Sequence, residues 1–141
     1  MNDGLKRINV TVAPQEPQES VLNAWALLNE LEQMLLALID HERPSSIDLR
    51  GVPLTAADRR TLERVLGEGE INVEIDALGM SRVRETAVHG VWWVTHHDDD
   101  GKTVAEFLEV SYCPDILRSH KDDVRDTLEN LRAHLAQHTE T

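Results

Sequence analysis

The most apolar stretch of the chain has the periodicity of a helix. It begins after Ser20, a residue type that commonly caps helices, and apolar residues recur at helical spacing as far as His41, shortly before Pro44. Further apolar residues, among them Ala26 and Leu36, widen the stripe beyond a single face. Because such a helix must be buried on most sides, we expect it to pack in the core, against a second chain, or against both.

Two more helices are indicated further along the chain. Thr55 is a candidate N-cap with Asp58 three residues later, and the apolar residues of this second helix stop at Gly67. The third helix runs from Ser119 to about His138. It carries a narrow apolar stripe made of Val124, Leu128, Leu131 and Leu135. We expect the third helix to lie across one face of a sheet.

Four segments between the second and third helices have the patterns of strands. Residues 70–77 alternate between apolar and polar side chains, which is typical of a half-buried strand, and residues 81–88, 91–96 and 103–112 follow as further strands. Residues 7–12 and 47–49 are additional short candidates. Turn residues and short connections favour an antiparallel meander. The predicted fold is α+β, a four-stranded antiparallel meander sheet with about three helices packed mainly on one face.

Length and charge limit the classes of partner. With 141 residues the chain has the size of one domain, and we assign residues 1–19 to an N-terminal arm and residues 20–141 to a single domain. The 14 Lys and Arg against 26 Asp and Glu give a net charge of −12, which repels nucleic-acid phosphates and anionic lipids. We therefore expect no nucleic acid and no membrane as partner, whereas a basic protein segment would be attracted.

The sequence shows no targeting segment and no cysteine pair. Residues 1–10 lack the apolar core of a signal peptide, and no stretch reaches the roughly 18 apolar residues of a membrane span, so we expect a cytoplasmic protein. Cys113 is the single cysteine, which excludes a disulfide within one chain.

Metal-binding residue types are present, but not at the spacing of a known metal site. His96 and His97 are adjacent in a predicted strand and point apart, and the aspartates that follow them form a good turn without a metal. A lone cysteine such as Cys113 is usually a small buried hydrophobe. We expect no enzyme activity and no cofactor. The alternative is a metal-binding or metal-delivery protein that uses His96, His97, Cys113 and His120.

Trp92 and Trp93 are adjacent in a predicted strand, so they point to opposite faces of the sheet. We expect one of the two to meet solvent or a partner, because exposed tryptophan is a frequent anchor of protein interfaces.

Several short matches, spread over residues 54–124, resemble a known family. It is the hydrogenase expression/formation protein family, HupH and HyaF, and the resemblance is to its C-terminal domain. The matches are Leu54-Thr55-Ala56-Ala57-Asp58, Leu66-Gly67-Glu68-Gly69-Glu70, Thr86, Val91-Trp92, Leu108-Glu109-Val110, Pro114 and Asp122-Asp123.

The resemblance implies an accessory role in the maturation of uptake-type nickel–iron hydrogenases. Family members act as chaperones, binding the precursor of the iron–sulfur small subunit before its twin-arginine export, alongside other hydrogenase maturation proteins. Members are usually longer, with a preceding N-terminal region, so this chain is expected to be a shortened or stand-alone version. Ser81 departs from the pattern, since members often have a cysteine there.

The resemblance also assigns the two tryptophans to different environments. Trp92 is expected in the core with Val94, and Trp93 at the surface with Val91. Together with Glu74 and Asp76, Trp93 and Val91 are the residues predicted to bind a partner. A further alternative is a regulatory homodimer closed by the apolar helix of residues 21–39.

Overall fold

The sheet has one strand more than the sequence predicted. The computed structural model describes residues 20–139, so the predicted arm of residues 1–19 lies outside the described residues. The helices are α1 Leu22–His41, α2 Ala56–Leu66 and α3 Lys121–Thr139, and short 3₁₀ turns occupy Leu49–Gly51 (η1) and Asp115–Leu117 (η2). The strands are β1 Ser45–Asp48, β2 Asn72–Asp76, β3 Met80–Glu85, β4 Val91–His97 and β5 Thr103–Val110. The α+β class is confirmed.

All neighbouring strands are antiparallel, in the order β1-β5-β4-β3-β2. The predicted meander of β2 to β5 is confirmed, but the count of four strands is wrong, because β1 adds to the outer edge of β5. Ser45 of β1 lies opposite Val110 of β5. In this strand only Ile47 is buried, so the apolar signal was too short to distinguish a strand from a loop.

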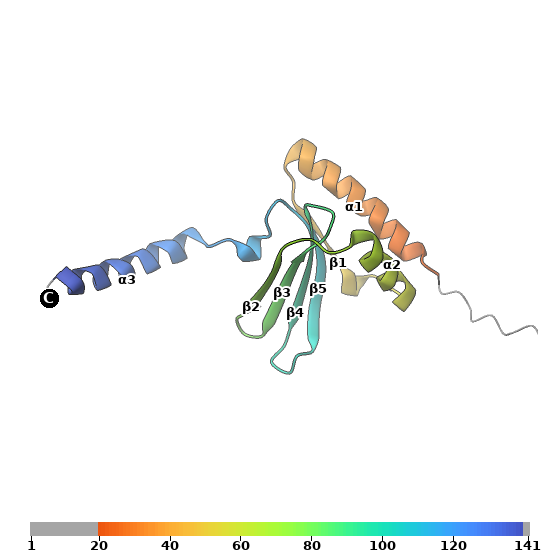
Figure 1. The fold of residues 1–141 in the computed structure, drawn as a ribbon. Helices are drawn as coiled ribbons and strands as arrows, with labels where there is room; N and C mark the ends of the chain where they lie inside the picture. The colour runs from red at the N-terminus through yellow and green to blue at the C-terminus, as the bar shows by residue number, and fades with distance from the viewer. Residues whose placement is uncertain (1–19, 140–141) are drawn as a thin grey trace, which may run out of the picture.

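The first two helices pack on the same face of the sheet (Figure 1). A buried cluster joins α1 and α2 to β1, β4 and β5; its members are Ala24, Leu27, Leu31, Leu38, Ile47, Leu49, Leu62, Leu66, Val91, Trp93, Leu108 and Val110. A smaller cluster lies on the opposite face, where Val83, Trp92 and Val94 pack together with Leu117 of η2. Both faces of the sheet centre are therefore buried.

Asp58 holds the starts of α1 and α2 together. The predicted N-cap Thr55 is confirmed, and it forms a capping box with Asp58: the backbone N–H of Asp58 donates to Thr55 Oγ1 (3.0 Å), and that of Thr55 donates to Asp58 Oδ2 (3.0 Å). The other carboxylate oxygen accepts the backbone N–H of Ala24 in α1 (3.0 Å). The bond from the Thr55 backbone contributes most to lowering the pKa of this buried carboxyl, against the effect of burial, which raises it.

The third helix does not lie across the sheet as expected. In Figure 1, α3 extends away from the sheet and from both other helices, and none of its residues is buried. The expectation was wrong because an apolar stripe at helical spacing does not specify which surface covers it. The sheet face opposite α1 and α2 is partly closed by the segment that contains η2 instead.

Candidate protein-binding surface

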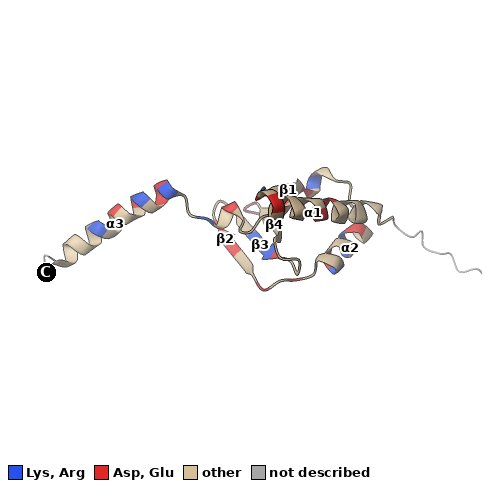
Figure 2. Cartoon of the chain, turned by 90° about the horizontal axis from the view of Figure 1, so that it is seen from above, with Lys and Arg blue, Asp and Glu red and all other residues tan. Residues whose placement is uncertain are grey.

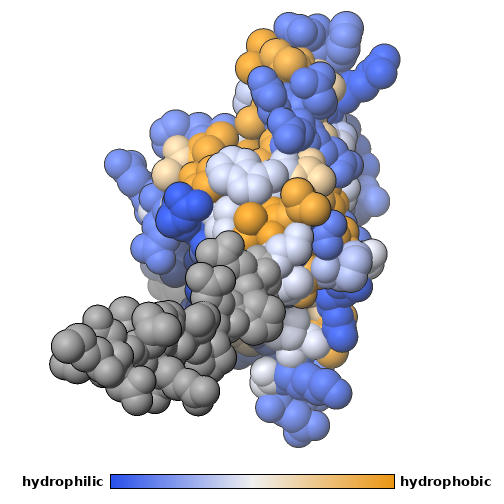
Figure 3. All heavy atoms as spheres, turned by 90° about the vertical axis from the view of Figure 1, so that its right-hand side faces the viewer, coloured by the Kyte–Doolittle hydropathy of each residue, from blue (hydrophilic) through white to orange (hydrophobic). Residues whose placement is uncertain are grey.

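An apolar groove lies between α1, the end of α2 and the connection from β3 to β4. Its volume is about 320 Å³, and it is lined by Leu28, Leu31, Glu32, Leu35, Leu36, Ile39, Val65, Leu66, Val88 and Val91. Figure 3 shows hydrophobic residues gathered on the face that α1 and α2 form. Among the described residues, Glu32 is the one charged side chain that lines the groove. We call this surface the α1 groove.

Three apolar side chains of the α1 groove are open to solvent. Leu36 is 46% exposed, Ile39 65% and Val65 38%, and Trp25 on the same helix is 47% exposed. A contiguous apolar surface rimmed by polar residues marks an interaction site on a soluble domain. The wide apolar stripe of α1 is thus only partly used by the core, and its coverage by a second chain stays a prediction.

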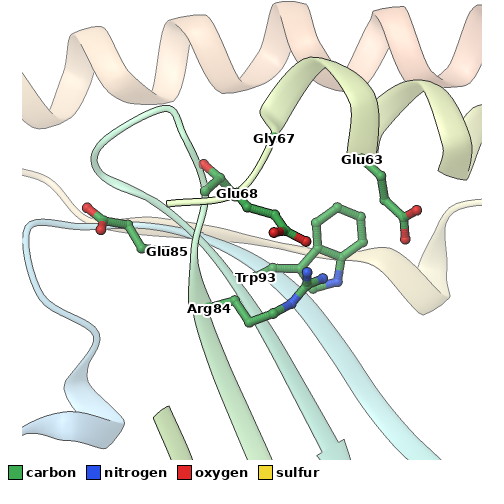
Figure 4. A pocket seen from close by; sticks show the side chains of 7 residues that line it. Glu63, Gly67, Glu68, Arg84, Glu85 and Trp93 are labelled. Atoms are coloured by element: carbon green, nitrogen blue, oxygen red, sulfur yellow. The ribbon is translucent and has the colours of Figure 1, made fainter. Parts of the chain in front are cut away.

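A smaller, acidic cavity of about 150 Å³ opens beside the end of α2. Figure 4 shows Glu63 on α2, Glu68 just beyond it, and Arg84 of β3 lying against the indole of Trp93; Glu85 also lines the cavity. The Arg84 guanidinium carbon is 5.5 Å from the centre of the indole ring. Three glutamates against one arginine leave this cavity with an excess of negative charge, which favours basic groups near its mouth.

The indole N–H of Trp93 is hydrogen-bonded to a buried carboxylate, that of Glu106. The Nε1–H of Trp93 donates to Glu106 Oε2 at 2.9 Å, and the other oxygen of Glu106 accepts from Arg59 of α2. Burial raises the pKa of Glu106, but the hydrogen bonds from Arg59 and Trp93 together outweigh it, so that the pKa lies below its ordinary value. The sequence does not predict this link between α2 and the sheet, because Arg59 and Glu106 are far apart in the chain and neither belongs to a motif.

The predicted surface position of Trp93 and Val91 is wrong. Trp93 is 3% exposed and Val91 is fully buried, because α1 and α2 cover the sheet face to which both belong. Trp92 and Val94 are buried together, as predicted, but on the opposite face. The Nε1–H of Trp92 donates to the carbonyl of Ser111 at 3.0 Å. Neither tryptophan of the pair offers an exposed anchor.

The other two predicted partner-binding residues are at the surface. Glu74 and Asp76 are exposed on β2, an edge strand of the sheet. Glu74 accepts from Arg82 of the neighbouring strand at 2.8 Å. The partner-binding role of Glu74 and Asp76 stays a prediction.

The residues of the alternative metal site are not gathered. His96 Nδ1 lies 2.7 Å from Ser81 Oγ, whereas His97 Nδ1 lies 3.3 Å from Thr103 Oγ1. Cys113 and His120 are exposed on the segment that leads to α3. Within residues 20–139, no group of three or more His, Cys, Asp or Glu side chains is placed to hold a metal ion.

None of the helices within residues 20–139 is both long enough and apolar enough to cross a bilayer.

Comparison with known proteins gives one consistent result. Residues 21–138 match the model of the family described as HupH hydrogenase expression protein, C-terminal conserved region. The hydrogenase expression/formation protein HoxQ of Azotobacter vinelandii is 36% identical over 95 residues, which are 67% of this chain and 33% of that protein. HupQ of Azotobacter chroococcum mcd 1 is 31% identical over 116 residues, or 81% of this chain and 41% of that protein. The matched segments thus cover well under half the length of these relatives.

A solved structure shares the fold. The hydrogenase expression protein HupH from Thiobacillus denitrificans superposes with a TM-score of 0.78 at 36% sequence identity, and the match covers 82% of this chain and 96% of that one.

Proposed function

The chain belongs to the HupH hydrogenase expression protein family, and from this membership we propose that it is an accessory protein of hydrogenase maturation that binds the precursor of a hydrogenase small subunit. Its mode of action is binding, without a catalytic step and without a cofactor of its own. The observation that carries the proposal is the α1 groove, an open apolar surface on a chain with a net charge of −12.

The α1 groove suits the kind of segment that such a precursor carries. An export signal combines a positively charged region with a run of about 7–15 apolar residues. The apolar run would lie against Leu36, Ile39 and Val65, which are exposed in the free chain. The basic region would meet Glu32 in the groove and the glutamates of the neighbouring acidic cavity.

Calorimetric titration with a small-subunit precursor tests the proposal. We expect binding to the complete precursor and a clear loss of affinity when its signal segment is deleted. An Ile39→Glu variant should bind more than about tenfold more weakly, because a charge would replace an apolar contact in the groove. Leu22→Glu is the matched control, since Leu22 is 76% exposed on the same helix and does not line the groove.

Two outcomes would count against the proposal. If neither form of the precursor binds, the chain does not act on this client. If both forms bind equally well and Ile39→Glu has no effect, the client uses another surface, such as the β2 edge that carries Glu74 and Asp76.

A further inference from the structure

The helix α3 presents an apolar stripe that no other part of residues 20–139 buries. The stripe consists of Val124, Leu128, Leu131 and Leu135, which are between 41% and 57% exposed. Their spacing of four, three and four residues is that of a helix that packs lengthwise against another apolar surface. Figure 2 shows α3 apart from the remainder of the fold, with basic and acidic residues along the helix.

The charges beside this α3 stripe are basic. Arg125 and Arg132 directly follow Val124 and Leu131 and so border the stripe on one side, while Thr127 and His134 border it on the other. The acidic residues of α3 lie farther round the helix; they are Asp122, Asp123, Asp126 and Glu129. A surface that fits α3 should therefore be apolar and should carry negative charge.

Pairing of α3 with the α3 of another copy does not meet this requirement. In a parallel pair, Arg132 would face Thr127 of the other helix, so that no ion pair forms. In an antiparallel pair the bordering arginines of the two helices would face each other and repel. The α3 stripe therefore fits a different kind of surface better than it fits itself.

The α1 groove has the complementary character. Its lining is apolar except for Glu32, and the charged residues of α1 are all acidic, namely Glu30, Glu32 and Asp40. A helix that covers the groove must supply a cation to Glu32, because burying an unpaired carboxylate is strongly unfavourable. The arginines beside the α3 stripe supply it. Their present ion pairs, Arg125 with Asp122 at 3.6 Å and Arg132 with Glu129 at 2.8 Å, are exposed and hence weak, so they can exchange partners.

We propose that α3 of one copy docks in the α1 groove of a second copy. Because α3 extends away from its own body, its stripe is available to another molecule (Figure 1). Reciprocal exchange of α3 closes a two-fold dimer with two identical contacts. The proposal rests on the proposed function in one respect, namely that the same groove binds the small-subunit precursor. In that case α3 and the precursor compete for the groove, and in the dimer the groove is occupied by α3 of the second copy.

Sedimentation equilibrium on single variants and their mixture tests the arrangement. We expect the wild type to dimerise with increasing concentration, and Leu131→Glu and Ile39→Glu each to be monomeric. Ala133→Glu, which adds the same charge on the opposite side of α3, should still dimerise. An equimolar mixture of Leu131→Glu and Ile39→Glu should form a heterodimer, because one intact α3 can dock in one intact groove. Thermal unfolding of Leu131→Glu should match the wild-type monomer, since Leu131 is outside the core.

The charge requirement has its own test. Glu32→Arg should weaken the dimer, and the additional change Arg132→Glu in the same chain should restore it, because the ion pair is then reversed rather than lost. Three results would overturn the proposal: a monomeric wild type at every concentration, an Ile39→Glu variant that still dimerises, or a mixture that stays monomeric.

Titration with the precursor separates this inference from the proposed function. If α3 competes with the client, Leu131→Glu should bind the precursor several-fold more tightly than the wild type. Equal affinities together with a monomeric wild type would refute the docking of α3 and leave the function intact. If no variant binds the precursor while the mixture forms the heterodimer, the function is refuted and the docking of α3 stands.

Discussion

Replacing Glu106 with glutamine would test the buried link between α2 and the sheet. In the native protein its two carboxylate oxygens accept from Arg59 and from the indole N–H of Trp93. Glutamine keeps the shape but has only one acceptor oxygen. The variant therefore cannot satisfy both donors, and its amide N–H₂ would face one of them.

The expected loss follows from the exposure of the two donors. The indole of Trp93 is buried and would keep the remaining oxygen, so that Arg59 loses its partner. A buried hydrogen bond to a charged group contributes about 1.5–3 kcal/mol. Because the Arg59 side chain is 42% exposed, water recovers part of this contribution, and we expect Glu106→Gln to lower the free energy of unfolding by about 1–2 kcal/mol at neutral pH.

The pH dependence of this loss has a definite sign. The pKa of Glu106 is lower in the folded chain than its ordinary value. Its ionisation therefore stabilises the fold above the ordinary carboxyl pKa, and this contribution disappears as the pH falls through the folded-state pKa. Glu106→Gln has no such contribution, so the difference between wild type and variant should shrink in acid.

Urea denaturation followed by tryptophan fluorescence measures both the loss in the free energy of unfolding and its pH dependence. Glu74→Gln is the matched control: its ion pair with Arg82 is exposed on both sides, and its removal should change stability by less than about 0.5 kcal/mol. A Glu106→Gln variant as stable as the wild type at neutral pH would refute the reasoning. So would a difference that stays constant from neutral pH into acid.

Three further predictions concern the core, a histidine and a turn. Leu62→Ala should lower the free energy of unfolding by about 2–5 kcal/mol in urea denaturation, because Leu62 of α2 is fully buried in the cluster that joins α1 and α2 to the sheet. The hydrogen bond to Glu85, and secondly the charge of Glu85, raise the pKa of His89. NMR titration should therefore find a lower pKa for His89 in Glu85→Gln. The stabilisation from this pair is present at low pH and is lost as the pH rises through the folded-state pKa of His89. Gly79→Ala should destabilise more than Gly101→Ala: both residues have positive φ, but a Cβ at Gly79 would lie 2.3 Å from the His97 carbonyl oxygen, whereas Gly101 has nothing within 4 Å.

The parts of the fold that the sequence predicts well are those set by neighbouring residues. The capping box of Thr55 and Asp58 and the alternation in β2 depend on residues within a few positions of each other, and both are present in the structure. The short strand β1 was missed as a member of the sheet because its identity depends on β5, which lies far away in the chain.

The site was harder to predict because exposure depends on which face the helices cover. The sequence separates Trp92 from Trp93 correctly, yet it does not say which face α1 and α2 occupy, and the choice of Trp93 as the exposed one was wrong. The α1 groove combines residues of α1, α2 and the β3 to β4 connection. In the sequence, the groove is indicated only by the unusual width of the apolar stripe on α1. That width predicts a surface that must be covered, but it does not say which other elements line the groove.

The position of β1 beside β5 also affects how the chain is made. During synthesis α1 and β1 emerge well before β4 and β5, which they contact in the finished fold. The meander from β2 to β5 can form by successive local hairpins, but α1 and β1 must wait for a loop of the whole intervening chain to close. Until β4 and β5 have been made, the apolar side of α1 therefore stays unburied, and α1 is exposed to aggregation, or to capture by general chaperones, before folding is complete.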